Sequence, residues 1–205
     1  MGTTNNTAEL QQIKVAKTTI HIKGLSPLIM HRWDEKAKKQ MLDKQMKKTV
    51  KKEAKSPEDQ YDASVYWMTD EKDRVGFPAD AFKKAMVRGA DLLGGKDVGM
   101  PMVKMRMAFF IHGEYSERDD RELVPINGKI TMREDMVRLN GATSDIRFRG
   151  QVQDWDAELK ISYNSSLVSF DQIVNMLHAA GFGVGVGEWR PERDGTFGRF
   201  EVVAQ

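Results

Sequence analysis

Six glycines lie within 18 residues near the C-terminal end of the chain, at residues 181–198. Glycine weakens the interior of a strand, so this density needs a reason, such as the close approach of another backbone or of a ligand. Val184 and Val186 alternate with glycines, and this alternation predicts a strand. We therefore interpret the run as a bare stretch of sheet that continues into a loop.

Known phosphate-binding glycine loops do not fit this context. The dinucleotide-binding loop follows a strand and opens a helix, whereas this run follows a predicted helix and leads into Pro191. A P-loop would need a Lys-Ser or Lys-Thr pair, which is missing here. The loop instead presents one aromatic and three guanidinium groups, Trp189, Arg190, Arg193 and Arg199. Such a surface suits stacked bases and phosphates. The alternative is a structural hairpin that buries Trp189.

The composition predicts a soluble cytoplasmic protein with no membrane partner. Of its 205 residues, 40% are hydrophobic and 30% are charged, which is typical of a folded domain. No apolar run reaches the ~20 residues of a membrane span. The chain has no cysteine, which excludes disulfides, thiolate catalysis and cysteine zinc sites and fits a reducing compartment. Residues 1–12 are polar and are predicted to form a disordered tail.

Positive charge is concentrated in one segment, although the net charge is only +2. Residues 31–55 contain ten lysines and arginines against four acids. Asp34 can cap a helix that runs to about Thr49 and has few apolar anchors. This basic helix either contacts nucleic acid or is simply a solvated face.

The remaining patterns predict an α+β fold. Strands are expected at residues 18–24, 64–68, 102–112, 151–163 and 197–203, and further helices at 79–93 and 170–180. Residues 114–150 are charged and rich in turn signals, and they are predicted to form a protruding hairpin insertion. The resulting order of βαββ modules favours a ferredoxin-like (RRM-like) fold with an antiparallel sheet and a glycine-rich C-terminal loop.

Three segments resemble the RAMP superfamily of CRISPR-associated proteins. The glycine run with its later Gly195-x-x-Gly198-Arg199-Phe200 is similar to that family's glycine-rich signature. Residues 75–88, with Pro78, Lys84 and Arg88, are similar to the segment that opens a helix beside bound RNA. The first strand and its following loop match in the same order. Asp80 and the Trp189–Glu192 insert depart from the family pattern, which leaves open a true CRISPR subunit or a distant, virus-encoded relative.

The resemblance implies one RAMP-like domain at residues 13–205, with a basic helical insertion at about 34–55 and a hairpin insertion at about 114–150. It is most similar to the effector-backbone subunits, which polymerise along a guide RNA. It implies phosphate contacts from the helix at residues 79–93 and from the glycine loop, and the hairpin would be the family's thumb. The predicted nucleic-acid-binding residues are Arg32, Lys36, Lys39, Lys83, Lys84, Arg88, Arg147, Arg149, Gly183, Gly185, Gly187, Trp189, Arg190, Arg193 and Arg199.

Catalysis has only weak candidates, His31 and Asp34, in the loop after the first strand. A histidine can act as a general acid or base near neutral pH, and some RAMP relatives cut RNA with a histidine or with an acid and a metal. A single histidine beside Arg32 and Trp33 is more often a contact or packing residue. No metal-ligand motif is present, so no metal and no cofactor are expected.

The sequence thus favours a non-catalytic subunit that binds single-stranded RNA or DNA and associates with copies of itself or with related subunits. The first alternative is a RAMP-type endoribonuclease that uses His31 or Asp34. The second is a structural or protein-interaction module, such as a viral assembly or inhibitor protein, in which the basic segment meets an acidic partner.

Overall fold

The fold is of the α+β class with an antiparallel sheet, as predicted, and this sheet has eight strands among the described residues. The computed structural model describes residues 12–33, 39, 41–43, 45–47, 56–93, 101–139 and 143–203. The strands are β1 (Val15–Gly24), β2 (Leu28–Ile29), β3 (Val75–Pro78), β4 (Phe109–His112), β5 (Glu114–Ser116), β6 (Arg121–Leu139), β7 (Thr143–Asn164) and β8 (Phe200–Val202). The helices are α2 (Pro57–Ser64), α3 (Ala79–Leu92), α4 (Met102–Ala108), α5 (Phe170–Ala179), the π-helical turn η1 (Ala180–Val184) and the 3₁₀ turn η2 (Pro191–Arg193).

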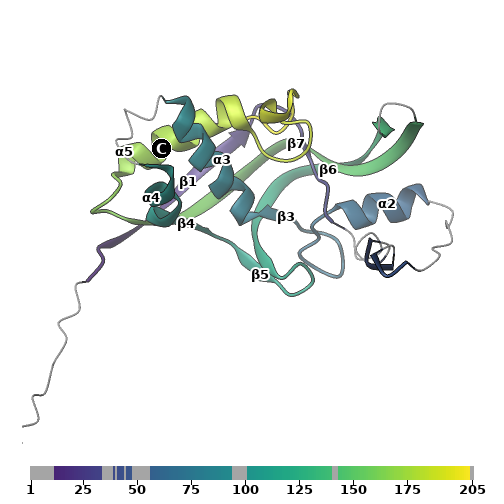
Figure 1. The fold of residues 1–205 in the computed structure, drawn as a ribbon, viewed down its shortest axis with the longest axis horizontal. Helices are drawn as coiled ribbons and strands as arrows, with labels where there is room; N and C mark the ends of the chain where they lie inside the picture. The colour runs from purple at the N-terminus through teal and green to yellow at the C-terminus, as the bar shows by residue number, and fades with distance from the viewer. Residues whose placement is uncertain are drawn as a thin grey trace, which may run out of the picture.

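The long strand β7 organises the sheet (Figure 1). The main strand order is β3-β6-β7-β1-β8, while β2 and β4 also pair with β7 and β5 pairs with β6. All of these pairings are antiparallel. Because β7 pairs with β1 over most of its inner half and with β6 over its outer half, a single strand connects the body of the molecule to the protruding hairpin.

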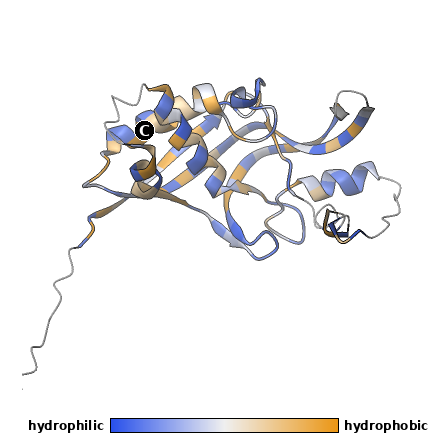
Figure 2. Cartoon of the chain, in the orientation of Figure 1, coloured by the Kyte–Doolittle hydropathy of each residue, from blue (hydrophilic) through white to orange (hydrophobic). Residues whose placement is uncertain are grey.

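The core lies between one face of the sheet and the helices α3 and α5 (Figure 1). Trp155, Leu159 and Ile161 alternate along β7 and are buried on this face, as their period of two predicts. The same alternation of hydrophobic and hydrophilic residues is visible along β6 and β7 in Figure 2. Phe200 of β8 lies edge-to-face between Trp155 and Phe82 of α3, with ring centroids 6.1 and 6.2 Å apart.

Local signals set the ends of both core helices. Ser169 and Gln172 form a capping box at the start of α5, a motif that satisfies two backbone donors reciprocally. Pro78 ends β3 and occupies the N-cap position of α3, so the direction of that helix is set where it leaves the sheet.

Outside the glycine run, two further strand predictions are wrong in whole or in part. Residues 102–108 form α4, and only residues 109–112 form a strand. The alternation of Val103, Met105 and Met107 suggested a strand, yet Val103 and Met107 are exposed while Met105 is buried. Residues 64–68 do not form a strand either, because α2 ends at Ser64 and only an isolated bridge links Trp67 to Val75.

The glycine run is not a strand and does not form a bare sheet surface. Helix α5 continues into the π-helical turn η1, and the chain then forms a packed loop. Gly181 packs so closely against the backbone of Phe200 that a Cβ atom would lie 2.1 Å from its carbonyl oxygen. Gly185, Gly187 and Gly198 have φ values of +70°, +82° and +66°, a region that favours glycine. The glycines therefore permit close packing and left-handed backbone, not exposure of the sheet.

The predicted hairpin is present, but its strands belong to the sheet. Strand β7 runs without interruption from Thr143 to Asn164, so the segment predicted as an insertion and the strand predicted at 151–163 are continuous. The outer part of the β6–β7 hairpin extends beyond the body (Figure 1). The observed element order does not confirm ferredoxin-like βαββ modules. Residues 1–11 of the predicted tail and most of the predicted basic helix lie outside the described residues.

Candidate nucleic-acid interface

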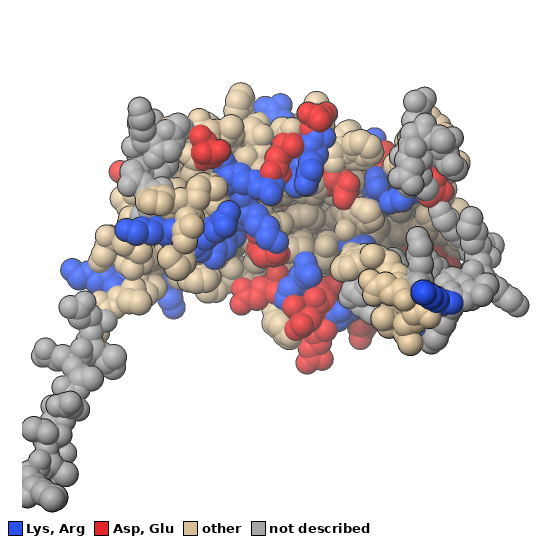
Figure 3. Space-filling view, in the orientation of Figure 1, with Lys and Arg blue, Asp and Glu red and all other residues tan. Residues whose placement is uncertain are grey.

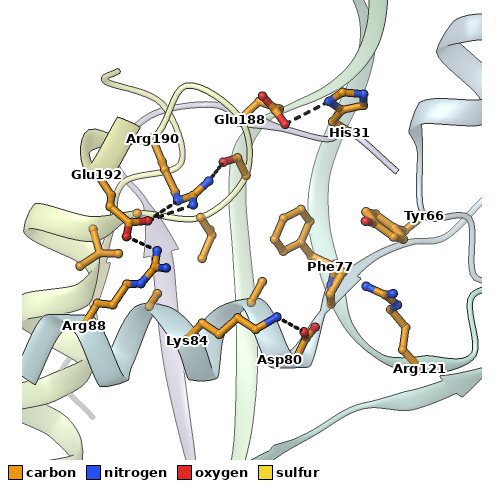
Figure 4. A pocket seen from close by; sticks show the side chains of 17 residues that line it. His31, Tyr66, Phe77, Asp80, Lys84, Arg88, Arg121, Glu188, Arg190 and Glu192 are labelled. Atoms are coloured by element: carbon orange, nitrogen blue, oxygen red, sulfur yellow. Dashed lines mark hydrogen bonds and ion pairs between the residues drawn. The ribbon is translucent and has the colours of Figure 1, made fainter. Parts of the chain in front are cut away.

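A groove of about 270 Å³ separates α3 from the glycine loop, which is the segment of residues 185–198 after η1. Helix α3 contributes Asp80, Lys84 and Arg88, which recur every four residues and therefore share one helical face. The glycine loop contributes the other wall, and Tyr66, Phe77 and Arg121 border the groove at its far end (Figure 4). Residues far apart in the sequence therefore converge on one concave surface.

Backbone hydrogen bonds hold the glycine loop over the groove. The amide of Glu188 donates to the carbonyl of Ile29, and the amide of Gly198 donates to that of Pro27. Gly187 lies against the same segment, since a Cβ atom there would be 2.5 Å from the Ile29 oxygen. The loop after β1 and the glycine loop are thus locked together, and this explains why the run needs glycine at this position.

A shared carboxylate bridges the two walls of the groove. Glu192 pairs with Arg88 of α3 through one oxygen and with Arg190 through the other, at 2.9 Å from the Nη2 atom of Arg190. Arg190 also donates to the carbonyl of Gly187 at 3.0 Å. Lys84 pairs with Asp80 at 2.6 Å along the helix. These contacts hold three cations in fixed positions on the groove wall (Figure 4).

Arg121 differs from the other groove cations. Its Nε atom donates to the carbonyl of Asp119 at 3.2 Å, and it forms no ion pair with any carboxylate in the described part of the chain. It lies beside Tyr66 (Figure 4). Burial raises the pKa of Tyr66, while the nearby charges of Arg121 and Arg32 oppose this, so the phenol is neutral at physiological pH.

His31 and Glu188 form a hydrogen-bonded pair at the edge of the groove. The Nδ1 atom of His31 lies 3.0 Å from Oε1 of Glu188. This hydrogen bond lowers the pKa of Glu188 below its ordinary value, and the charges of Arg149 and Arg190 act in the same direction against the effect of burial. Glu188 is therefore ionised, and its carboxylate can orient the imidazole.

Basic side chains gather on this face of the molecule around α3, and acidic ones gather below them around β5 and the start of β6 (Figure 3). Four cations and three carboxylates line the groove itself, so it is only weakly positive by formal count. The arrangement can bind phosphates through exchange of ion-pair partners. Among the described residues, no group of three His, Asp or Glu side chains could hold a metal ion.

The structure brings only some of the predicted site residues together. Lys84, Arg88, Gly185, Gly187, Arg190 and His31 line the groove. Lys83 lies on the neighbouring side of α3, with its Nζ atom 4.0 Å from the ring centroid of Phe110. Trp189 is 41% exposed outside the groove, which contradicts the alternative that it is buried. Two further predicted residues do not line the groove. Gly183 lies against Leu92, and Arg193 is exposed.

Arg32 and Arg149 were predicted to contact nucleic acid, yet both are buried. Arg32 forms a buried ion pair with Asp119, and each side chain is 4% exposed. Arg149 pairs with Asp135, which also pairs with Arg133. These arginines therefore fix the loop after β1 and the base of the hairpin, and they are not free to meet a ligand.

The other predicted residues that the structure describes lie away from the groove. Arg147 is half-buried on the hairpin, where its Nε atom lies 3.7 Å from the Oδ2 atom of Asp145. Arg199 lies 5.8 Å from the ring of Phe182. Lys39 has helical backbone and an exposed side chain. Lys36 and Asp34 lie outside the described residues. Sequence reasoning missed Tyr66, Arg121 and Glu188, because only the tertiary fold brings them to the groove.

Comparison with known proteins gives a distant likeness to solved structures. No family model matches the chain, and no curated protein matches it. Among solved structures, the chain is similar to the crystal structure of Cmr6 from Pyrococcus furiosus, with a TM-score of 0.44 and 9% sequence identity over 94% of this chain and 100% of that one. This likeness in fold carries no functional conclusion. Among the described residues, no helix combines the length and hydrophobicity needed to cross a bilayer.

Proposed function

We propose that this chain is a non-catalytic RNA-binding subunit that holds a single polynucleotide chain in the groove between α3 and the glycine loop. The observation that carries the proposal is the convergence of Lys84, Arg88, Arg190 and Arg121 on one concave surface. Guanidinium groups bind phosphate through paired donors, which suits a polynucleotide backbone. The resemblance of residues 75–88 and of the glycine run to the RAMP superfamily supports the same conclusion.

Several features of the groove favour a single-stranded ligand. The groove has a volume of only about 270 Å³, and the buried residues Tyr66 and Phe77 line part of it between charged walls. Because these rings are mostly covered by the core, a ligand meets the groove mainly through its cations, which can bind the phosphates of one strand. Binding within a complex of related subunits, side by side along one RNA, is part of the proposal.

The proposal is tested by fluorescence anisotropy with a labelled single-stranded RNA at low salt. The wild-type protein should bind below about 10 µM, since even non-specific binding of nucleic acid usually reaches ~1–100 µM. The double variant Lys84→Gln, Arg88→Gln should bind at least about tenfold more weakly, because it removes two phosphate partners.

A matched control is available on α4, where Lys104 and Arg106 are exposed and lie outside the groove. The variant Lys104→Gln, Arg106→Gln changes the net charge by the same amount and should bind RNA nearly as well as the wild type. Equal losses in both double variants would mean that binding follows net charge alone, and the groove would not be the site.

One observation favours a second candidate function, an endoribonuclease. The His31–Glu188 pair lies at the groove edge close to Arg190. A carboxylate bound to one imidazole nitrogen leaves the other nitrogen able to accept a proton from a ribose hydroxyl. Labelled RNA incubated with the protein, with and without a chelator, tests this function. Cleavage that is lost in His31→Ala would support it, and RNA that stays intact with the wild-type protein would exclude it.

A further inference from the structure

The face of the sheet opposite to α3 and α5 is open to solvent in the described part of the chain. Side chains that alternate with the buried positions emerge here from three adjacent strands, β1, β7 and β4. Lys17, Thr19 and Lys23 of β1 are exposed, as are Glu158 and Lys160 of β7. Most residues on this face are polar, and no described helix covers them.

Strand register places three basic side chains together on this open face. Lys160 of β7 pairs with Thr19 of β1 on one side and with His112 of β4 on the other. Lys17 pairs with Ser162, so Lys17 is a diagonal neighbour of Lys160, about 7–8 Å away across the strands. Residues in such positions share one face and can act on one ligand.

These side chains line a shallow hollow of about 330 Å³, which we call the open-face recess. Its lining residues are Lys17, Thr18, Thr19, His112, Lys160 and Ile161, and none of these is an acid. Neither Lys17 nor Lys160 forms an ion pair within the described residues. In this respect the recess differs from the groove, where Glu192 and Asp80 already pair with three of the four cations.

Acids mark the limits of the recess on one side. Glu158 lies two residues before Lys160 on the same face of β7, and Glu122 is 3.9 Å from the Nδ1 atom of His112. Asp156 lies farther along β7, where it accepts hydrogen bonds from Asn127 and His21. An anion would therefore bind toward Lys17 and away from these carboxylates.

A second hollow adjoins the groove on the side of the sheet edge. Asp80 and Arg121 border both the groove and this second hollow of about 440 Å³, which is also lined by Lys83 and Phe110 and by the acids Asp120 and Glu122. Phe110 pairs with Ser162 on the open face, and yet Lys83 reaches its ring from α3. The ring is 53% exposed. It therefore lies at the edge of the sheet, between the two faces, two residues before His112.

We propose that the open-face recess binds phosphates of the same polynucleotide after it leaves the groove and passes over the sheet edge at Phe110. The inference rests on the proposed function of the groove and extends its footprint to the other side of the sheet. Lys17 and Lys160 neutralise phosphates on the open face, and an unpaired base stacks on Phe110 at the edge.

The test compares RNAs of about 5 and about 15 nucleotides, which span the site sizes of single-strand-binding domains. The variant Lys17→Gln, Lys160→Gln should bind the long RNA about five- to tenfold more weakly and the short RNA as the wild type does. The slope of log K against log salt for the long RNA should fall by about 1.4, because each phosphate contact on a single strand adds about 0.7. Phe110→Ala should weaken binding of the long RNA alone.

Three results would overturn the inference in distinguishable ways. If Lys17→Gln, Lys160→Gln binds the long RNA with wild-type affinity and slope while Lys84→Gln, Arg88→Gln does not, the groove stands and the recess is refuted. If the control Lys104→Gln, Arg106→Gln loses as much affinity for the long RNA as the recess variant does, the effect is one of net charge. If the wild type binds neither RNA, the proposed function fails and this inference fails with it.

Discussion

Ion pairing within the groove sets how strongly this chain can hold an anion. Arg88 and Arg190 share the carboxylate of Glu192, and Lys84 is paired with Asp80. A phosphate that enters must replace these carboxylates, so part of its attraction to the cations is offset by the loss of existing pairs. The groove is therefore expected to bind more weakly than its number of basic residues suggests.

Removal of the Glu192 charge should strengthen RNA binding. In Glu192→Gln, both guanidinium groups lose their carboxylate, and the repulsion between that carboxylate and a phosphate also disappears. We expect affinity to rise about two- to fivefold, consistent with the ~0.2–1 kcal/mol of an exposed pair. Anisotropy titration against Glu71→Gln, an exposed acid outside the groove, measures the effect. Weaker binding would mean that Glu192 positions the arginines for the ligand.

The pair of His31 and Glu188 should make stability depend on pH in a specific direction. Because the hydrogen bond from His31 lowers the pKa of Glu188, the carboxylate stabilises the fold above the ordinary glutamate pKa of about 4.3 and loses this effect as pH falls through its lower folded value. The unfolding free energy of the wild type should exceed that of Glu188→Gln near neutral pH, and the difference should shrink toward about pH 3.

The size of this difference is limited by solvent. Both side chains of the pair are 39% exposed, so screening keeps the contribution below about 1 kcal/mol. Urea denaturation of the two proteins at several pH values measures it. A difference that stays constant across the acid range would show that the amide of the variant acts through packing and not through charge.

The glycine loop is the element whose conformation the groove depends on most. Gly198 has a φ of +66°, and a Cβ atom there would lie 1.7 Å from the carbonyl oxygen of Val186. Gly198→Ala should therefore lower the unfolding free energy by about 2–4 kcal/mol, through left-handed backbone strain and overpacking.

Gly183→Ala, in the turn η1 just before this loop, is the control. Its Cβ atom would meet only the end of the Leu92 side chain, which can move, so the cost should stay below about 1 kcal/mol. Urea denaturation distinguishes the two variants. Equal effects would contradict the view that Gly198 is required by the backbone and Gly183 is not.

Elements with strong local signals could be predicted from the sequence, and those that depend on distant partners could not. Helix α5 has a capping box and a clear apolar stripe, and the sequence predicts this helix from such local features. Helix α4 has seven residues, too few for the period to separate helix from strand. The glycine run was misread because its conformation depends on contacts with Phe200, β2 and the loop before it.

The same distinction between local signals and distant partners applies to the residues of the candidate site. Lys84, Arg88 and Arg190 stood in recognisable segments and do line the groove. Arg32 was predicted to be a contact, but it is buried against Asp119, 87 residues away. Charge alone cannot separate an arginine that binds a ligand from one that is neutralised inside the fold, because both look basic in the sequence.

At the scale of the whole molecule, the β6–β7 hairpin has two chemically different faces. Met136 and Ile146 are cross-strand partners and are 72% and 49% exposed, respectively. Arg133, Asp135 and Arg149 occupy the opposite face and bind one another at its base. An exposed apolar face on a protruding element is suited to contact with another molecule.

Assembly along RNA should therefore depend on this apolar face. If copies lie side by side, the number bound per RNA should rise in steps with RNA length, and neighbouring copies should bind cooperatively through Met136 and Ile146. Met136→Lys, Ile146→Lys should abolish that cooperativity on long RNA and leave the affinity for a short RNA unchanged. Sedimentation velocity of protein–RNA mixtures measures both. Leu92→Lys, Leu167→Lys adds the same charge at exposed positions elsewhere and should assemble normally, whereas one copy per RNA at every length would exclude assembly.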